Sequence, residues 1–280
     1  MNESDAGKEP GGGGRPGKAW LAVGATLLLL AALAFLPREK KAGKTKRPVV
    51  VEKNPSYAIP SQRRSYFKLE SNGSLELRDG LPFRGDGLYD LERTIVPRRT
   101  AVIVMDPWVD TPSGELNAEH GRIADHRLLP LVRQALSLEH PVLVLTNRPS
   151  PDKSHPSVHP GLAELAEEGA LRILYHEDFD DDAFAVLLRG ERIDTLIYTG
   201  FASNMCVIGR RTGMIPMIHH GFRMFFVPEA SAAIEWEESG DDNATHEAAT
   251  RIISQWIAEI VRFDDFMMVR LSDELGRSSP

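Results

Sequence analysis

Between residues 100 and 260, continuous apolar runs alternate with segments in which apolar residues recur at helical spacing. Continuous apolar runs are typical of strands that are buried on both faces of a parallel sheet. The runs are Ala101–Met105, Pro141–Thr146, Leu171–Tyr175, Thr195–Tyr198 and Arg223–Val227. Helices are predicted at Ile123–Leu138, with Pro130 as an early break, and at Gly161–Glu168, Ala183–Arg189 and Ala244–Ile260. This alternation predicts a three-layer α/β fold with a mostly parallel central sheet flanked by helices.

The N-terminal part of the chain has a different pattern. Residues 1–18 are rich in glycine and polar residues, which predicts a disordered head. Residues 19–36 carry no charge and are long enough for one transmembrane helix, with Trp20 at the membrane interface. A cleaved secretory signal is the alternative, since Ala32–Ala34 fits a cleavage site. Three basic residues precede this segment and six follow it, which favours a single-pass membrane protein with a cytoplasmic body over an exported one.

The remaining boundaries follow from composition. Residues 37–97 are interpreted as a basic juxtamembrane linker and an extension that packs on the body or on a partner, with one strand at Ser74–Arg78. The body occupies 98–272 and a short tail follows at 273–280. The net charge of −7 argues against a nucleic-acid-binding body. Cys206 is the only cysteine, which excludes an intrachain disulfide and a multi-cysteine zinc site.

Chemically active residues follow several of the predicted strands. Asp106 follows the first strand of the body, His176 the third, and Cys206 a small-residue turn after the fourth. In parallel sheets, ligands bind beyond the carboxyl ends of the strands. Backbone N–H groups at a helix start favour a thiolate or a developing oxyanion, and Asp106 could take the proton of the thiol. The structural alternatives are a cysteine that only packs and an aspartate that only caps a loop.

Other chemistries fit the spacing poorly. A phosphotransfer site of the haloacid dehalogenase type needs aspartates two apart, whereas Asp106 and Asp110 are four apart. The glycine pattern of a dinucleotide site is absent after the first strand of the body. His155 and His159 lie in a proline-rich loop, and the acidic run 180–182 fits a helix cap better than a cation site. We therefore predict no metal and no cofactor.

Three segments resemble one family, the isochorismatase-like cysteine hydrolases, which include nicotinamidases and N-carbamoylsarcosine amidases. They are RTAVIVMDPWVDTPSGEL (99–116), GFASNMCVIGRRTGMIPMIHHGFRMFFVPEASAA (200–233) and DNATHEAATRIISQWIAEI (242–260), and the likeness spans about 98–270. The resemblance implies that Asp106 deprotonates Cys206, whose thiolate attacks an amide-type carbon to give a thioester-like intermediate. It also implies an oxyanion hole of backbone N–H groups near Cys206 and a cis peptide at Phe201–Ala202.

Two departures from the family are evident. The family's third catalytic residue is a lysine near the end of the third strand, but residues 171–184 contain none, and Asp178 occupies the equivalent position. His176 is the nearest substitute, and Lys153, in the preceding loop, is a weaker one. The metal motif of nicotinamidases, Asp-x-His after the second strand, is replaced by Asn147–Pro149.

The sequence therefore predicts a membrane-anchored, homo-oligomeric cysteine hydrolase that acts on a small amide or a related C–N bond. Its predicted catalytic residues are Cys206, Asp106 and His176, and the predicted pocket and oxyanion residues are Ala202, Phe201, Trp108 and Met205. An inactive member that serves as a binding or scaffold module is the alternative, because the lysine is missing. A vinyl-ether hydrolase of the isochorismatase type is a third, weaker option.

Overall fold

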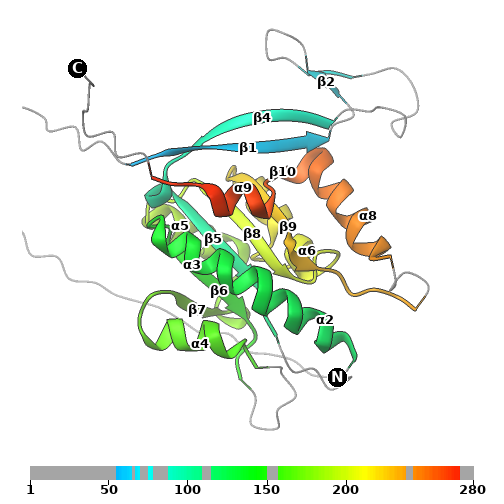
Figure 1. Cartoon of the computed structure of the whole chain (residues 1–280). Helices are drawn as coiled ribbons and strands as arrows, with labels where there is room; N and C mark the ends of the chain where they lie inside the picture. Colours follow the sequence, from blue (N-terminus) through cyan, green and yellow to red (C-terminus); the bar gives the residue numbers. More distant parts are fainter. Residues whose placement is uncertain are drawn as a thin grey trace, which may run out of the picture. The chain divides into compact units, whose positions relative to one another are not determined.

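The fold is built on an eight-stranded sheet, in the order β4-β1-β10-β9-β8-β5-β6-β7 (Figure 1). The computed structural model describes residues 55–64, 67–69, 75–77, 88–108, 115–149, 157–237 and 242–271. The sheet strands are β1 (Tyr57–Arg64), β4 (Leu88–Ile95), β5 (Thr100–Met105), β6 (Val142–Thr146), β7 (Arg172–Tyr175), β8 (Thr195–Phe201), β9 (Arg223–Ala232) and β10 (Glu259–Ile260). From β10 to β7 all neighbours are parallel, whereas β1 pairs antiparallel with β10 and β4. Two short strands, β2 (Phe67–Leu69) and β3 (Leu75–Leu77), pair separately.

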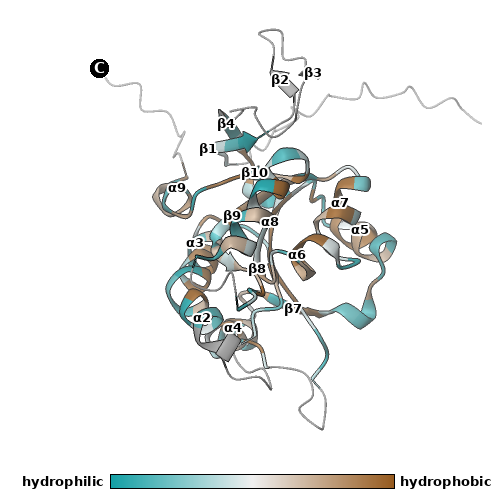
Figure 2. Cartoon of the chain, turned by 90° about the vertical axis from the view of Figure 1, so that its right-hand side faces the viewer, coloured by the Kyte–Doolittle hydropathy of each residue, from teal (hydrophilic) through white to brown (hydrophobic). Residues whose placement is uncertain are grey.

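Helices cover both faces of the sheet (Figure 2). One layer contains α2 (Glu115–Ile123), the π-helical turn η4 (Ala124–Leu128), α3 (Leu129–Ser137), α4 (Pro160–Glu167) and α9 (Phe263–Met268). The other contains α5 (Asp181–Gly190), α6 (Cys206–Gly209), α7 (Met214–His219) and the π-helical turn η6 (Ile253–Ile257), which continues α8 (Ala244–Ile252). Short 3₁₀ turns, η3 (Pro97–Arg99) and η5 (His176–Asp178), precede β5 and follow β7. The predicted three-layer α/β fold is confirmed.

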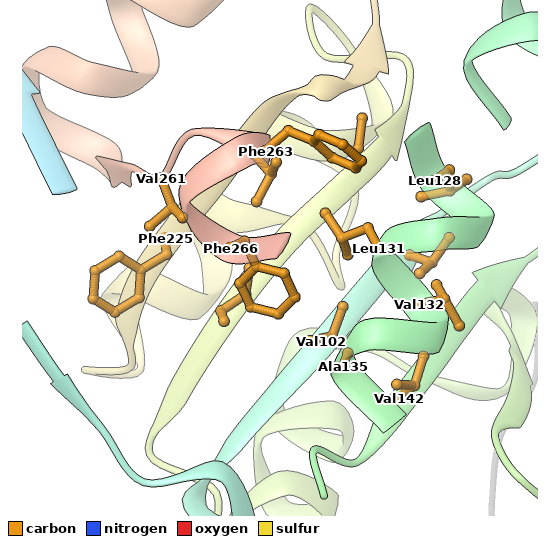
Figure 3. Close-up of a cluster of buried hydrophobic side chains, with 14 of the residues drawn as sticks. Val102, Leu128, Leu131, Val132, Ala135, Val142, Phe225, Val261, Phe263 and Phe266 are labelled. Carbon is orange, nitrogen blue, oxygen red and sulfur yellow. The ribbon is translucent and has the colours of Figure 1, made fainter. Parts of the chain in front are cut away.

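The strand β5 shows why the central strands are continuously apolar. Its side chains alternate between the two cores, with Val102 and Val104 on one face and Ile103 and Met105 on the other, and all are fully buried. On the first face α3 and α9 pack over β5 and β9 through their apolar side chains (Figure 3). Removing each such side chain from water stabilises the fold by about 1.5–3 kcal/mol.

Two helices differ in extent from the sequence prediction. The segment 115–137 is helical throughout, and Pro130 does not break it. The preceding π-helical turn η4 widens the helix locally, and Pro130 lies at the start of α3, where its missing N–H is tolerated. The helix predicted at Ala244–Ile260 ends earlier, because the chain passes from η6 into the short strand β10.

The sheet extends further toward the N-terminus than the sequence suggested. Both β1 and β4 precede residue 98, yet they form one edge of the main sheet. Glu259 of β10 fixes this junction, since its carboxylate accepts hydrogen bonds from Ser61 Oγ (2.7 Å) and Arg93 Nε (2.9 Å). Part of the predicted extension therefore belongs to the folded body.

The prediction of a single-pass membrane protein is corrected. The predicted anchor, 19–36, lies outside the described residues, as do the predicted head and the tail. Within the residues that the structure does describe, no helix is long and apolar enough to cross a membrane. The longest helical segment among the described residues, 115–137, contains the charged residues Glu119, Arg122, Asp125, Arg127 and Arg133, whereas a bilayer span needs about 20 predominantly apolar residues. The membrane assignment and the cytoplasmic orientation derived from it are therefore not upheld.

Candidate active site

The centre of the candidate site is Asp106, at the carboxyl end of β5. Its side chain is completely buried, and its backbone N–H donates to the carbonyl of Leu145 at 2.8 Å. The backbone of Asp106 has a φ of 42°, a left-handed conformation that aspartate adopts more readily than bulkier residues. The carboxylate is therefore fixed above the strand ends.

Two basic side chains hold the two oxygens of this carboxylate. His176 Nε2 lies 2.8 Å from Asp106 Oδ1, and Arg210 Nε lies 3.2 Å from Asp106 Oδ2. On the other side of the imidazole, His176 Nδ1 lies 3.3 Å from Thr212 Oγ1. Because a carboxylate can only accept, Nε2 carries the proton toward Asp106; in the neutral imidazole Nδ1 then accepts from the threonine hydroxyl.

The turn between β8 and α6 brings Cys206 to the same place. At Gly200 the φ is 103°, and a Cβ there would lie 2.2 Å from the carbonyl oxygen of Met105 on β5. Only glycine therefore allows β8 to approach β5 so closely. The following peptide, Phe201–Ala202, is cis, as the family resemblance implied. Cys206 is half-buried at the first position of α6.

The thiol of Cys206 lies beside the side chains of both Asp106 and Arg210, and each of them affects its pKa. Burial raises the pKa of the Cys206 thiol, and the negative charge of Asp106 raises it further, while the charge of Arg210 opposes the rise. Burial alone would lower the pKa of Arg210, but Asp106 and Cys206 outweigh it and raise that pKa. Burial and Asp106 therefore favour the protonated thiol, and the neighbouring cation of Arg210 favours the thiolate.

The predicted pocket residues lie in different surroundings. Phe201 is buried and stacks on His120, with ring centroids 4.4 Å apart, and Ala202 is buried beside it. Trp108 is partly buried and donates from Nε1 to Thr146 Oγ1 at 2.9 Å, which fixes it at the end of β6. The side chain of Met205, in contrast, is 54% exposed. The parts that these residues would play toward a substrate remain predictions.

Several polar residues singled out in the sequence have partners other than Asp106. Asp178 is half-exposed and forms an ion pair with Arg148 at 2.5 Å. Asp180 accepts a hydrogen bond from the Ala183 N–H and caps α5, as predicted for the acidic run. His159 caps α4.

No metal centre emerges from these groups. His155 and Lys153 lie outside the described residues. Over the described ranges, no group of three or more histidine, cysteine, aspartate or glutamate side chains is arranged to hold a metal ion.

Arg210 is the site residue that the sequence analysis missed. Its spacing from Cys206 is the signal that was available, because residues four apart lie on the same face of a helix.

Comparison with known proteins places this geometry in a family. The Isochorismatase domain model matches residues 100–265, which is more than half of the chain. The chain belongs to the isochorismatase family. The matched domain contains Asp106, His176, Cys206 and Arg210, whereas β1 and β4 lie outside it.

Solved structures with the isochorismatase fold are distant in sequence. A cysteine hydrolase from Pseudomonas syringae pv. phaseolicola 1448A is 18% identical, with a TM-score of 0.50, over 62% of this chain and 92% of that one. A nicotinamidase from Staphylococcus aureus is 16% identical, over 58% and 97%, with a TM-score of 0.46. An isochorismatase from Pseudomonas putida KT2440 is 18% identical, over 60% and 89%, with a TM-score of 0.47. The search of curated proteins gave no match. At 18% identity the cysteine hydrolase, with its TM-score of 0.50, supports the fold of this chain and nothing more specific.

Proposed function

We propose that this protein is a cysteine hydrolase that cleaves a small amide or a related C–N bond, with Cys206 as nucleophile and Asp106 as general base. One arrangement carries the proposal: the Asp106 carboxylate, buried at the end of β5, lies against the Cys206 thiol at the start of α6. A base in contact with a nucleophile is the arrangement that nucleophilic catalysis requires. Membership of a hydrolase family agrees with it.

The proposed reaction starts from the protonated thiol. Asp106 takes the thiol proton as the sulfur attacks the carbonyl carbon, so that a C–S bond forms and the carbonyl π electrons move to oxygen. When the tetrahedral intermediate collapses, the C–N bond breaks and the amine leaves with the proton from Asp106. Water then gives a proton to Asp106 and attacks the thioester, the C–S bond breaks, and Cys206 recovers its proton.

The turn after β8 would supply the oxyanion donors. The N–H groups of Met205 and Val207 both donate to the carbonyl of Ala202, at 3.0 and 3.1 Å, so they are already engaged. We assign the oxyanion hole to the N–H groups of Cys206 and Ala202, since Cys206 lies at the first position of α6, where N–H groups have no acceptor within the helix. Phe201, Trp108 and Met205 would flank the substrate.

His176 would act as a positioning residue in this scheme. His176 hydrogen-bonds with Asp106 Oδ1 and thereby orients the carboxylate. The other oxygen, Oδ2, is then available to Arg210 and the thiol. Its replacement by alanine should therefore lower kcat by misplacing the base, and His176→Gln, which keeps one N–H donor, should restore part of the loss.

The experiment is a screen of small primary amides and N-carbamoyl compounds for release of ammonia. The wild type is compared with Cys206→Ser and Asp106→Asn, each checked for folding by circular dichroism. We expect both variants to lose at least about 10³-fold in kcat/KM, and rapid quenching should trap a thioester on Cys206 by mass spectrometry. Binding of an amide without turnover by the wild type would support the alternative of a binding module. The predicted homo-oligomer also stays a proposal, which sedimentation velocity would test.

A further inference from the structure

Arg210 is held against Cys206 by the short helix between them. Its N–H donates to the carbonyl of Cys206 at 3.3 Å, and the helix ends there. The chain then folds back tightly at Gly213. A Cβ at this position would lie only 2.9 Å from the carbonyl oxygen of Arg210 and 3.0 Å from that of Cys206, so the turn leaves room for glycine alone. Gly213 also precedes α7 directly, so two helices fix the turn that carries Arg210.

The guanidinium of Arg210 contacts both members of the proposed catalytic pair. Its Nε lies 3.2 Å from Asp106 Oδ2, and the Cys206 thiol is close enough to the same group to raise its pKa. The side chain is only 29% exposed, so water screens these interactions incompletely. Its neighbour Arg211 is exposed and forms no ion pair within the described ranges. The two consecutive arginines therefore differ in environment although they share a charge.

We propose that Arg210 is a further catalytic residue, whose guanidinium stabilises the Cys206 thiolate at the moment Asp106 takes the thiol proton. The inference rests on the proposed function. Before the transfer Arg210 pairs with the ionised carboxylate; afterwards the carboxyl group is neutral and the negative charge lies on sulfur. The cation thus exchanges one anionic partner for another within the same contact. Since arginine does not give up its proton, the proton goes only to Asp106 and from there to the leaving amine.

The test measures the thiol directly and needs no substrate. Cys206 is alkylated with iodoacetamide between pH 6 and 10, and the rate is followed by intact mass. Alkylation reports the thiolate, and the charged or titratable groups that face the sulfur are Asp106 and Arg210, with His176 behind the carboxylate. At pH 7.5 we expect Arg210→Met to slow alkylation about tenfold or more, as loss of an opposite charge in direct contact implies. Arg210→Lys should stay within about threefold of the wild type, and Arg211→Met is the matched control that should not change the rate.

Arg210→Met removes one partner of the buried Asp106 carboxylate and could therefore disturb the fold. The comparison is repeated in a protein that carries Asp106→Asn, where position 106 has no charge, so Asp106→Asn/Arg210→Met is compared with Asp106→Asn alone. We expect the Arg210 substitution to slow alkylation of Cys206 about tenfold here too. Equal rates within twofold in both backgrounds, or an Arg210→Lys variant as slow as Arg210→Met, would overturn the role assigned to Arg210.

The outcome separates this inference from the proposed function. Hydrolysis of a small amide by the wild type, together with unchanged alkylation of Arg210→Met, would refute the role of Arg210 and leave the proposed function standing. The expected alkylation pattern without any hydrolysis would support the contact between Arg210 and the thiolate, and it would count against the proposed function.

Discussion

A buried histidine far from the candidate site should make the protein sensitive to mild acid. His140 is 3% exposed, and its Nδ1 lies 2.8 Å from the carbonyl oxygen of Thr100. Its Nε2 lies 2.8 Å from the hydroxyl of Tyr57. Because the carbonyl can only accept, Nδ1 donates to it, and in the neutral ring Nε2 accepts from Tyr57. Burial lowers the pKa of His140 to about 4, with the hydrogen bond to Thr100 as a weaker, opposing influence.

The sign and size of the effect follow from proton linkage. The unfolded chain binds a proton at His140 with a pKa near 6.5, whereas the folded chain does so only near 4. Between these values the unfolded state holds more protons, so stability falls as the pH falls. At about 1.4 kcal/mol per pKa unit, the difference between the two pKa values corresponds to about 3 kcal/mol of folding stability. About 2 kcal/mol of this stability is lost between pH 7.5 and pH 5.

The assay compares the wild type with His140→Gln by urea unfolding at pH 7.5 and pH 5. Glutamine offers one donor and one acceptor but does not ionise. We expect the variant to be less stable at pH 7.5 by about 1–2 kcal/mol, and the gap to shrink or reverse by about 2 kcal/mol at pH 5. His126→Gln, at an exposed position in η4, is the control and should change little at either pH. A gap for His140→Gln that is the same at both pH values would refute the reasoning.

Three further predictions concern the site and the sheet. Asp106→Asn should speed alkylation of Cys206 at pH 7.5, because a charge that raises the pKa of the thiol is removed, although hydrolysis is lost; slower alkylation would contradict the electrostatic account. Gly200→Ala should lower the free energy of unfolding by about 3 kcal/mol or more, since its Cβ would overlap the backbone of β5. Gly221→Ala is the control in the same urea assay: its φ is also positive but its surroundings are open, so it should cost about 1 kcal/mol. Glu259→Ala should destabilise the protein by about 1–3 kcal/mol and Glu259→Gln by less, because this carboxylate joins the N-terminal strands to the sheet; equal losses would argue against the hydrogen bonds as the cause.

The central strands could be predicted because burial on both faces leaves a continuous apolar run. The N-terminal strands could not, since each lies near an edge of the sheet. In β1, buried and exposed residues alternate, and Pro60 lies within the strand. Such a segment is hard to distinguish from an extended linker. The two-residue strand β10 is too short to leave any pattern, and the apolar spacing before it continues that of α8.

The candidate site could be predicted only in part. The rule that ligands bind at strand ends led to Asp106, His176 and Cys206, which the structure brings together. The family resemblance predicts the cation at the end of the third strand, where those enzymes carry a lysine. The cation beside Cys206 comes instead from the turn after α6, whose position depends on how tightly the chain folds back at Gly213. The four-residue spacing from Cys206 indicates that Arg210 can lie near the thiol, but the close fold-back at Gly213 is a property of the tertiary structure.

The arrangement around Asp106 suggests why an arginine suits this position. Oδ1 is held by His176 at 2.8 Å, whereas the contact of Oδ2 with Arg210 is longer, at 3.2 Å. Oδ2 is therefore the oxygen from which a partner is more easily released, and the one that we expect to receive the thiol proton. A guanidinium presents several N–H donors in one plane, so it can keep a contact with the carboxyl group while another N–H turns to the sulfur. A lysine placed there offers a point charge on a flexible stem. It would preserve the electrostatic effect on the thiol, yet hold the two reacting groups less firmly, so Arg210→Lys should lower kcat more than it lowers the rate of alkylation.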